Sequence, residues 1–126
     1  MTLQQALNLT DELMPNTMER ATKIGYLSQI DGLIYHEILL THEHTPEQEV
    51  CPEYDSDTDQ GTVLLVPDNY AEDLYTNWLF SKIDLQNREM DMYNNHRALF
   101  ENAYDTMHDW WNRTYMPVQR NRQLWI

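Results

Sequence analysis

The sequence predicts a mainly α-helical protein with about four helices in a small bundle and a long acidic linker. We expect the linker to carry a short β element or to form an extended arm. Three observations predict this fold. Only three Gly occur among 126 residues, which suits helices better than turn-rich β structure. Apolar residues recur at helical spacing through most of the chain, and one acidic, proline-containing stretch interrupts them. The length predicts a single domain over residues 1–126.

The first part of the chain predicts two helices. Thr2 is a suitable N-cap for a short first helix, and Pro15 ends this helix because the residue before a proline avoids helical backbone angles. Its apolar face is formed by Leu3, Ala6, Leu7, Thr10, Leu13 and Met14. Asn16, three residues before Glu19, resembles a capping box, so a second helix is expected from there to about Leu40. Its buried stripe is predicted to contain Ile24, Leu27, Ile30, Ile34 and Ile38, widened by Tyr26 and Leu33.

Residues 42–66 are predicted to form the acidic linker or arm. This segment contains seven Asp or Glu residues and no Lys or Arg, and Pro46 and Pro52 forbid a continuous helix. Only residues 63–66 have the composition of a strand, and residues 49–51 are the expected pairing partner. A connection this long within a small domain is typically functional or disordered.

Two further helices are expected after the linker. Asp68 follows Pro67 and can cap the third helix, whose buried face is predicted to contain Ala71, Leu74, Tyr75, Trp78, Leu79 and Ile83. Residues 86–87 are the expected turn, and the fourth helix should run from about Arg88 to Asn112. Its broad apolar side contains Met92, His96, Leu99, Phe100, Ala103, Tyr104, Met107, Trp110 and Trp111.

The charge is strongly negative, because eight Lys and Arg stand against 21 Asp and Glu, giving −13. This charge argues against an open phosphate-binding surface. Residues 114–126 are instead predicted to form a basic tail. Such a tail can dock onto an acidic neighbour, including another copy of the chain, or remain untethered. Its candidate contact residues, with the preceding arginine, are Arg113, Arg120, Arg122, Leu124, Trp125 and Ile126.

Two patterns resemble metal sites. Residues 55–61 begin like a calcium-binding loop, but the glycine is one position late and Val66 stands where the bidentate Glu is needed. Three histidines near the end of the second helix could bind zinc, although they complete no HExxH motif. They are His36, His42 and His44. We therefore predict no metal site and regard solvated histidines and an acidic turn as the simpler interpretations.

The chain contains one cysteine, Cys51, so no internal disulfide can form. Its acidic neighbours, Glu49 and Glu53, disfavour a reactive thiolate. The sequence also contains no glycine-rich phosphate loop and no GxSxG motif. We predict no catalytic residue and no cofactor. The lone cysteine fits an intracellular compartment, and no apolar stretch approaches the length of a membrane span.

The fourth predicted helix ends in two adjacent tryptophans, Trp110 and Trp111. Neighbouring helical positions point about 100° apart, so the two indoles cannot share one direction. Most of the chain's aromatic residues are expected in the core. One of these two is predicted to face a partner, since Trp is enriched at protein interfaces.

Several short sequence words together resemble the head–tail connector (adaptor) proteins of tailed bacteriophages and prophages of Gram-positive bacteria. The words are DELMPN at 11–16, IDG at 30–32, LLVP at 64–67, DLY at 73–75, YNN at 93–95, LF at 99–100, AY at 103–104 and WNRT at 111–114, followed by Pro117. They cover most of the chain except the acidic linker and the final residues. Their order and spacing carry the resemblance, since no single word is specific.

The resemblance implies a non-enzymatic structural protein of the virion neck that is made in the host cytoplasm. Copies would form a ring beneath the portal protein, extend the DNA channel and receive the next neck or tail component. The subunit could be monomeric before assembly, and DNA would pass through the lumen without sequence-specific binding. Two alternatives stay open: a non-viral helical protein–protein adaptor, and a metal-dependent enzyme built on the three histidines.

Overall fold

The computed structural model describes residues 1–118, and the predicted contact residues Arg120, Arg122, Leu124, Trp125 and Ile126 lie outside this range. The fold is mainly helical, as predicted. Within residues 1–118 it contains four α-helices and two short helical turns. These are α1 (Leu3–Leu13), α2 (Arg20–Ile34), the π-helical turn η1 (Tyr35–Leu39), the 3-10 turn η2 (Pro46–Gln48), α3 (Asp68–Gln86) and α4 (Met90–Thr114).

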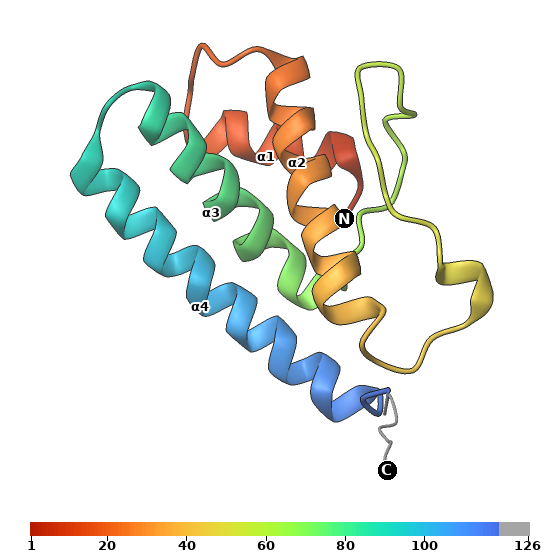
Figure 1. Cartoon of the computed structure of the whole chain (residues 1–126). Helices are drawn as coiled ribbons and strands as arrows, with labels where there is room; N and C mark the ends of the chain where they lie inside the picture. The colour runs from red at the N-terminus through yellow and green to blue at the C-terminus, as the bar shows by residue number, and fades with distance from the viewer. Residues whose placement is uncertain (119–126) are drawn as a thin grey trace.

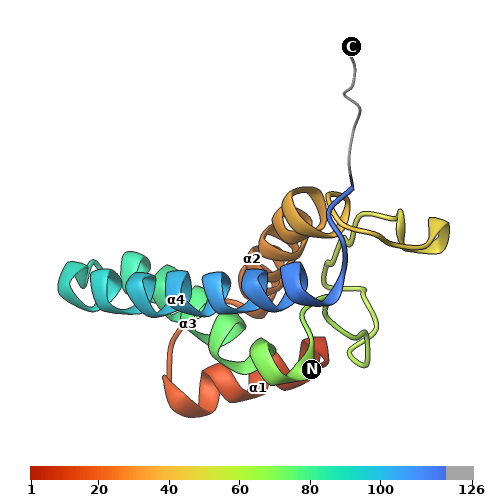
Figure 2. The same ribbon diagram turned by 90° about the horizontal axis from the view of Figure 1, so that it is seen from below.

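Helix α3 is the centre of the bundle. Helix α4 runs antiparallel beside it, and α1 and α2 also pack against α3 (Figures 1 and 2). The predicted inner face of α3 is confirmed, since Ala71, Leu74 and Leu79 have no exposed surface and Trp78 and Ile83 are also buried. This position lets α3 bury apolar side chains against all three other helices.

Helix α1 begins as predicted and then leads into a loop held by side chains. The Thr2 hydroxyl accepts the backbone N–H of Gln5, and the Gln5 side chain accepts the N–H of Thr2, which completes a capping box. Leu13, a member of the predicted apolar face, is 59 % exposed. Leu13 is the last residue of α1, where the chain already turns into the loop.

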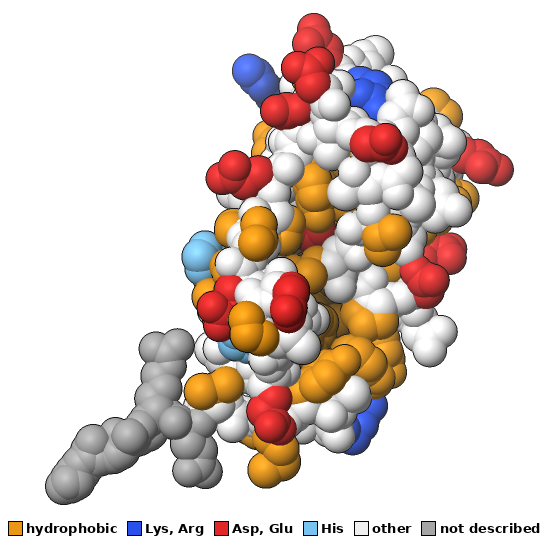
Figure 3. Space-filling view, turned by 90° about the vertical axis from the view of Figure 1, so that its right-hand side faces the viewer, with side chains coloured by type: hydrophobic (Ala, Val, Ile, Leu, Met, Phe, Trp, Pro, Cys, Tyr) orange, Lys and Arg blue, Asp and Glu red, His pale blue; other side chains and the backbone are white. Residues whose placement is uncertain are grey.

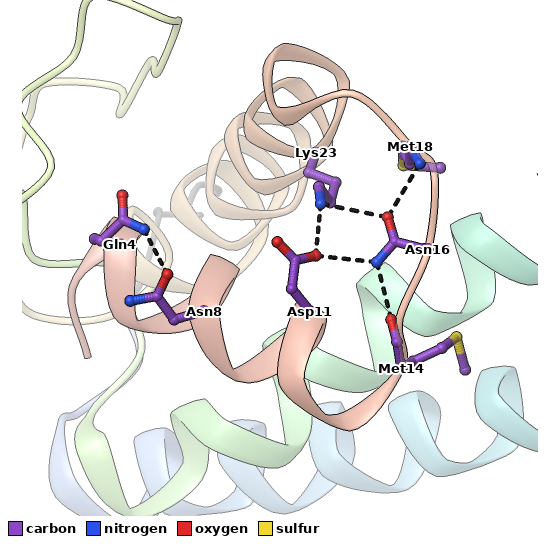
Figure 4. Close-up of polar contacts among 7 residues, drawn as sticks. All are labelled: Gln4, Asn8, Asp11, Met14, Asn16, Met18 and Lys23. Atoms are coloured by element: carbon purple, nitrogen blue, oxygen red, sulfur yellow. Dashed lines mark hydrogen bonds and ion pairs between the residues drawn. The ribbon is translucent and has the colours of Figure 1, made fainter.

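The expected capping role of Asn16 was also wrong, because Glu19 occupies the N-cap position of α2 without a side-chain bond. Asn16 instead organises the α1–α2 loop (Figure 4). Its amide donates to Asp11 (3.0 Å), and its Oδ1 accepts the N–H of Met18 (3.1 Å). The buried Lys23 ammonium reaches the same two side chains, at 2.6 Å from Asp11 and 3.3 Å from Asn16. The loop therefore satisfies an otherwise buried cation.

The predicted stripe of α2 is confirmed, and each of its five isoleucine and leucine residues is buried. The helix ends earlier than expected, at Ile34, and continues as the π-helical turn η1. Leu33 lies at the edge of the stripe and is 37 % exposed. The π-helical turn leads to Thr41, after which residues 42–66, called the acidic segment below, leave the bundle.

Helix α4 buries a narrower face than predicted. Only Phe100, Met107 and Trp111 are buried along it, whereas Met92 and Leu99 are exposed. The reason is that α4 packs chiefly on one neighbour, α3. A single neighbouring helix covers only a narrow stripe of α4, whose three buried residues are seven and four positions apart.

Residues 63–66 do not form the expected strand, and no other strand occurs within residues 1–118. Val63 forms a single antiparallel bridge with Thr2, so the end of the segment pairs with the N-terminal residues and not with residues 49–51. The N–H of Leu3 donates to the carbonyl of Thr62 (2.8 Å), which fixes this contact. No helix within residues 1–118 has the combined length and apolar character needed to cross a bilayer.

Candidate functional site

The chain after α4 folds back onto the end of η1. Residues 115–118, the C-terminal strap, run antiparallel to residues 41–43. The N–H of Val118 donates to the carbonyl of Thr41 (2.8 Å), and the N–H of Glu43 donates to a carbonyl of the strap (2.8 Å). Backbone hydrogen bonds of this kind position a segment whatever its side chains are.

The two adjacent tryptophans have different environments. Trp111 is buried, with 6 % exposure, and belongs to the main core. Trp110 is half-buried, and its ring packs 5.8 Å from Tyr70 and 6.0 Å from Tyr115, measured between ring centroids. Of the predicted contact residues within 1–118, Trp110 and the exposed Arg113 therefore have surface to offer a partner.

The buried His42 joins the strap, η1 and α4. Its Nδ1 donates to the carbonyl of Ile38 (2.7 Å), and its Nε2 lies 2.6 Å from the Asn112 Oδ1. The His42 ring also meets His108 edge-on, with 6.2 Å between centroids. Both ring nitrogens have protein partners, so the imidazole acts as a crosslink between helices.

The other two histidines of the predicted cluster also have protein partners. His44 Nδ1 donates to the His42 carbonyl (2.7 Å), and His44 Nε2 lies 2.8 Å from Glu49 Oε1. These two bonds raise the pKa of His44 above its usual value. His36 Nε2 lies 3.8 Å from Cys51 Sγ. Among residues 1–118, no three or more His, Cys, Asp or Glu side chains converge on a point that could hold a metal ion.

A fully buried carboxylate, Asp31, fastens the acidic segment to the bundle. Tyr75 donates its hydroxyl to Oδ1 (2.5 Å), and Tyr54 donates to Oδ2 (2.6 Å). The backbone N–H of Leu65 also donates to Oδ2 (3.0 Å), and the Tyr75 oxygen accepts the N–H of Val66 (3.0 Å). We call these five residues the Asp31 knot. It joins α2, α3 and two points of the acidic segment through one side chain.

Burial controls the ionisation of the Asp31 knot. Desolvation raises the pKa of Asp31, while the hydrogen bonds from Tyr54, Tyr75 and Leu65 oppose that rise. Desolvation also raises the pKa of both tyrosines, and the nearby Asp31 carboxylate adds to this shift. Both hydroxyls therefore remain protonated donors, so the network is a structural anchor.

The acidic segment shows an extended, carboxylate-rich surface. Figure 3 shows acidic side chains spread over this side of the molecule, with apolar ones between them. At its tip, Asp55 Oδ1 accepts the N–H of Asp57 (2.8 Å), and Asp59 Oδ1 accepts the N–H of Gly61 (2.7 Å). Carboxylates that accept local N–H groups in this way stabilise turns. These hydrogen bonds account for two of the acids without requiring a cation.

A groove of about 440 Å³ runs between α2 and α4. We call it the α2–α4 groove. Its floor contains Trp78 and Phe100, which are buried and lie 5.0 Å apart between centroids. Arg97 lies over both rings, at 5.8 Å and 5.4 Å, and its Nε donates to Glu101 (3.1 Å). The groove thus combines an aromatic floor with charged walls.

Sequence reasoning missed Asp31 and Tyr75 as partners, although a signal was present. Asp31 lies four residues after Leu27 and three before Ile34, so it falls on the apolar stripe of α2. A carboxylate on a buried stripe needs hydrogen-bond donors. The sequence could thus have identified the buried acid but not the three donors, which come from distant segments.

Comparison with protein-family models, with curated proteins and with solved structures found no match.

Proposed function

We propose that the chain is a structural subunit of the neck of a tailed bacteriophage or prophage. Copies would form a ring between the portal protein and the tail and extend the DNA channel. The observation that carries the proposal is the resemblance of the sequence, from residue 11 to Pro117, to head–tail connector proteins. In this role the chain is not an enzyme and needs no cofactor. It would be found in the virion neck, and in the host cytoplasm during assembly.

The charge distribution supports passage of DNA without adhesion. All 21 acidic residues precede the strap, and several lie on the open surface of the acidic segment (Figure 3). DNA carries dense negative charge, so a lumen lined by these acids would repel its phosphates. DNA of any sequence would therefore pass through the proposed channel without binding to its wall.

The surface of α4 supplies a candidate contact with neighbouring subunits. Its outer side carries the exposed Met92 and Leu99, and Arg113 lies at its end. Exposed apolar side chains on a helix with one neighbour are available to a second neighbour. We propose that this side contacts the next copy, and that the arm at residues 42–66 reaches the portal or the following neck component.

Inspection of the gene neighbourhood for a portal gene, followed by co-expression with the portal protein that it encodes, tests the proposal. We expect the two proteins to co-purify as a ring on the portal, visible by electron microscopy, even if the subunit alone is monomeric by light scattering. Leu99→Glu should prevent ring formation, and Leu13→Glu, at a similarly exposed position of α1, should not.

Two results would overturn the proposal. One is the lack of portal, large terminase and capsid genes in the gene neighbourhood. The other is a chain that remains monomeric and does not bind the portal, which would favour the non-viral adaptor. Stoichiometric zinc bound through His36, His42 and His44 would instead favour the metal-dependent enzyme.

A further inference from the structure

The α2–α4 groove has a chemistry that the proposed ring does not use. Its floor is apolar, and Leu33 forms an accessible apolar edge. Glu37, Glu101 and Asp105 lie along its walls, with Arg97 as the one cation among its lining residues. Since Arg97 already binds Glu101, the groove is left with excess negative charge. It suits a short segment that carries both cationic and apolar side chains.

The chain itself contains one such segment. Residues 119–126 read QRNRQLWI, with two arginines, no acid and three large apolar residues at the end. All 21 acidic residues of the chain lie before this segment. The composition of residues 119–126 is thus complementary to the groove in both charge and hydropathy.

We propose that the α2–α4 groove binds residues 119–126 of the same chain. The arginines would face Glu37, Glu101 and Asp105, and the Leu-Trp-Ile end would cover the aromatic floor. Unlike the ring proposal, this inference concerns the isolated subunit and does not depend on any partner.

The direction of the strap favours this intramolecular contact. Because the strap is antiparallel to residues 41–43, the chain travels back toward Thr41 as it leaves the described structure. The Thr41 hydroxyl donates to the carbonyl of Glu37 (2.9 Å), a residue of the groove wall. Val118, the last described residue, therefore pairs with Thr41, which lies one helical turn from Glu37 in the groove wall.

The length of the segment is sufficient. From Thr41 back to Ile30, the far end of the α2 wall, the helical rise spans about 16 Å. Eight extended residues reach about 26 Å, so residues 119–126 can cover the whole groove from their point of departure. Within one chain the contact therefore needs no second copy to supply the segment.

A nitroxide spin label on the full-length chain tests the proposal. The label is attached to Gln123→Cys in a Cys51→Ser background, and the amide signals of the isotope-labelled protein are recorded by NMR. We expect the amide signals of Leu33, Phe100 and Glu101 to be lost through paramagnetic broadening. The signals should return when the nitroxide is reduced.

Mixing distinguishes contacts within one chain from contacts between copies. Spin-labelled chain without the NMR isotope is added to isotope-labelled chain without the spin label. Intact groove signals in this mixture support the proposal, and broadened ones overturn it in favour of exchange between copies. Groove signals that persist in the doubly labelled chain would show that the groove is not the docking site.

Two matched pairs of variants test the chemistry of the groove. Asp105→Arg, on its wall, should restore the broadened signals, while Asp109→Arg, one turn further along α4 and outside the groove, should not. Leu33→Glu should act like Asp105→Arg, and Leu85→Glu, at a similarly exposed position of α3, is its control. Equal effects within either pair would overturn the proposal, and the amide spectra report whether each variant is folded.

Discussion

The acidic segment and the C-terminal strap both lack α-helix and are fastened to the helical bundle, but different interactions hold them. The acidic segment is anchored by side chains that converge on one buried carboxylate, Asp31. The strap is anchored by backbone hydrogen bonds beside the buried Trp111. The attachment of the acidic segment therefore depends on a single ionisable group, Asp31, whereas that of the strap depends on apolar burial and backbone hydrogen bonds.

This contrast has a consequence for how each segment can be released. Burial disfavours the ionised form of Asp31, so the stability of the acidic segment's anchor depends on pH. Burial of an indole does not depend on ionisation. We therefore expect the two segments to respond differently to substitution and to pH.

The largest effect should come from the apolar anchor of the strap. Trp111→Ala is expected to lower the free energy of unfolding by about 3–5 kcal/mol, because it removes a buried indole and leaves a cavity. Urea denaturation measures this change. Trp110→Ala is the control, with a smaller loss expected from its half-buried ring, and equal losses would contradict the contrast between the two positions.

The next largest effect should come from the acidic anchor. Asp31→Ala leaves two tyrosine hydroxyls and the Leu65 N–H without their acceptor, which should lower the free energy of unfolding by about 3 kcal/mol. Hydrogen exchange should show faster exchange at Leu65 while the strap amide of Val118 is unchanged. Asp57→Ala, at an exposed position, should change stability by less than about 0.5 kcal/mol. A similar loss in both variants would contradict the anchoring role.

The two tyrosines of the Asp31 knot should contribute unequally. Tyr75→Phe removes a donor to Asp31 and the acceptor of the Val66 N–H, so we expect a loss of about 2 kcal/mol. Tyr54→Phe removes one donor at a half-buried position, and its expected loss is about 1 kcal/mol. Thermal or urea denaturation checks the order, and a larger loss for Tyr54→Phe would place the main anchor in the acidic segment.

The smallest effect is a pH dependence that belongs to Asp31. Its pKa is raised from 3.8 by desolvation, so the folded state binds the proton more tightly than the unfolded state. The associated stability is fully present below pH 3.8 and is lost as the pH rises through the raised pKa. The free energy of unfolding should therefore fall with rising pH in the wild type relative to Asp31→Asn.

Urea denaturation of both proteins over a series of pH values measures this difference. Subtracting the variant removes the contributions of other groups, including the raised pKa of His44. An equal pH dependence in both proteins would show that Asp31 does not titrate within the window.

Local patterns predicted the helices well, although not their ends or all of their faces. The stripe of α2 and the inner face of α3 were predicted because apolar residues recur at helical spacing. The face of α4 was predicted too broadly, since spacing cannot reveal that Met92 and Leu99 have no second helix to cover them. Asn16 was assigned to a cap because capping motifs are local, whereas its actual partners include Lys23.

The candidate site was less predictable from the sequence. Trp110 and Trp111 were identified, and the helical angle indicated that they would differ, but only packing decided that Trp111 is the buried one. The three histidines were grouped by proximity in the sequence, yet His42 bonds to Asn112, 70 residues away. The α2–α4 groove could not be predicted, because its walls come from helices separated by the whole acidic segment.

The sequence by itself determined the helical class, the buried stripes, the acidic segment and the opposite charge of the chain's end. These properties follow from composition and from spacing along the chain, which act over one or two helical turns. Only the tertiary structure decided that Asp31 is the anchor of the acidic segment and that His42 joins η1 to α4. Such contacts depend on which distant donors meet a buried polar group, and the geometry of packed helices sets that meeting.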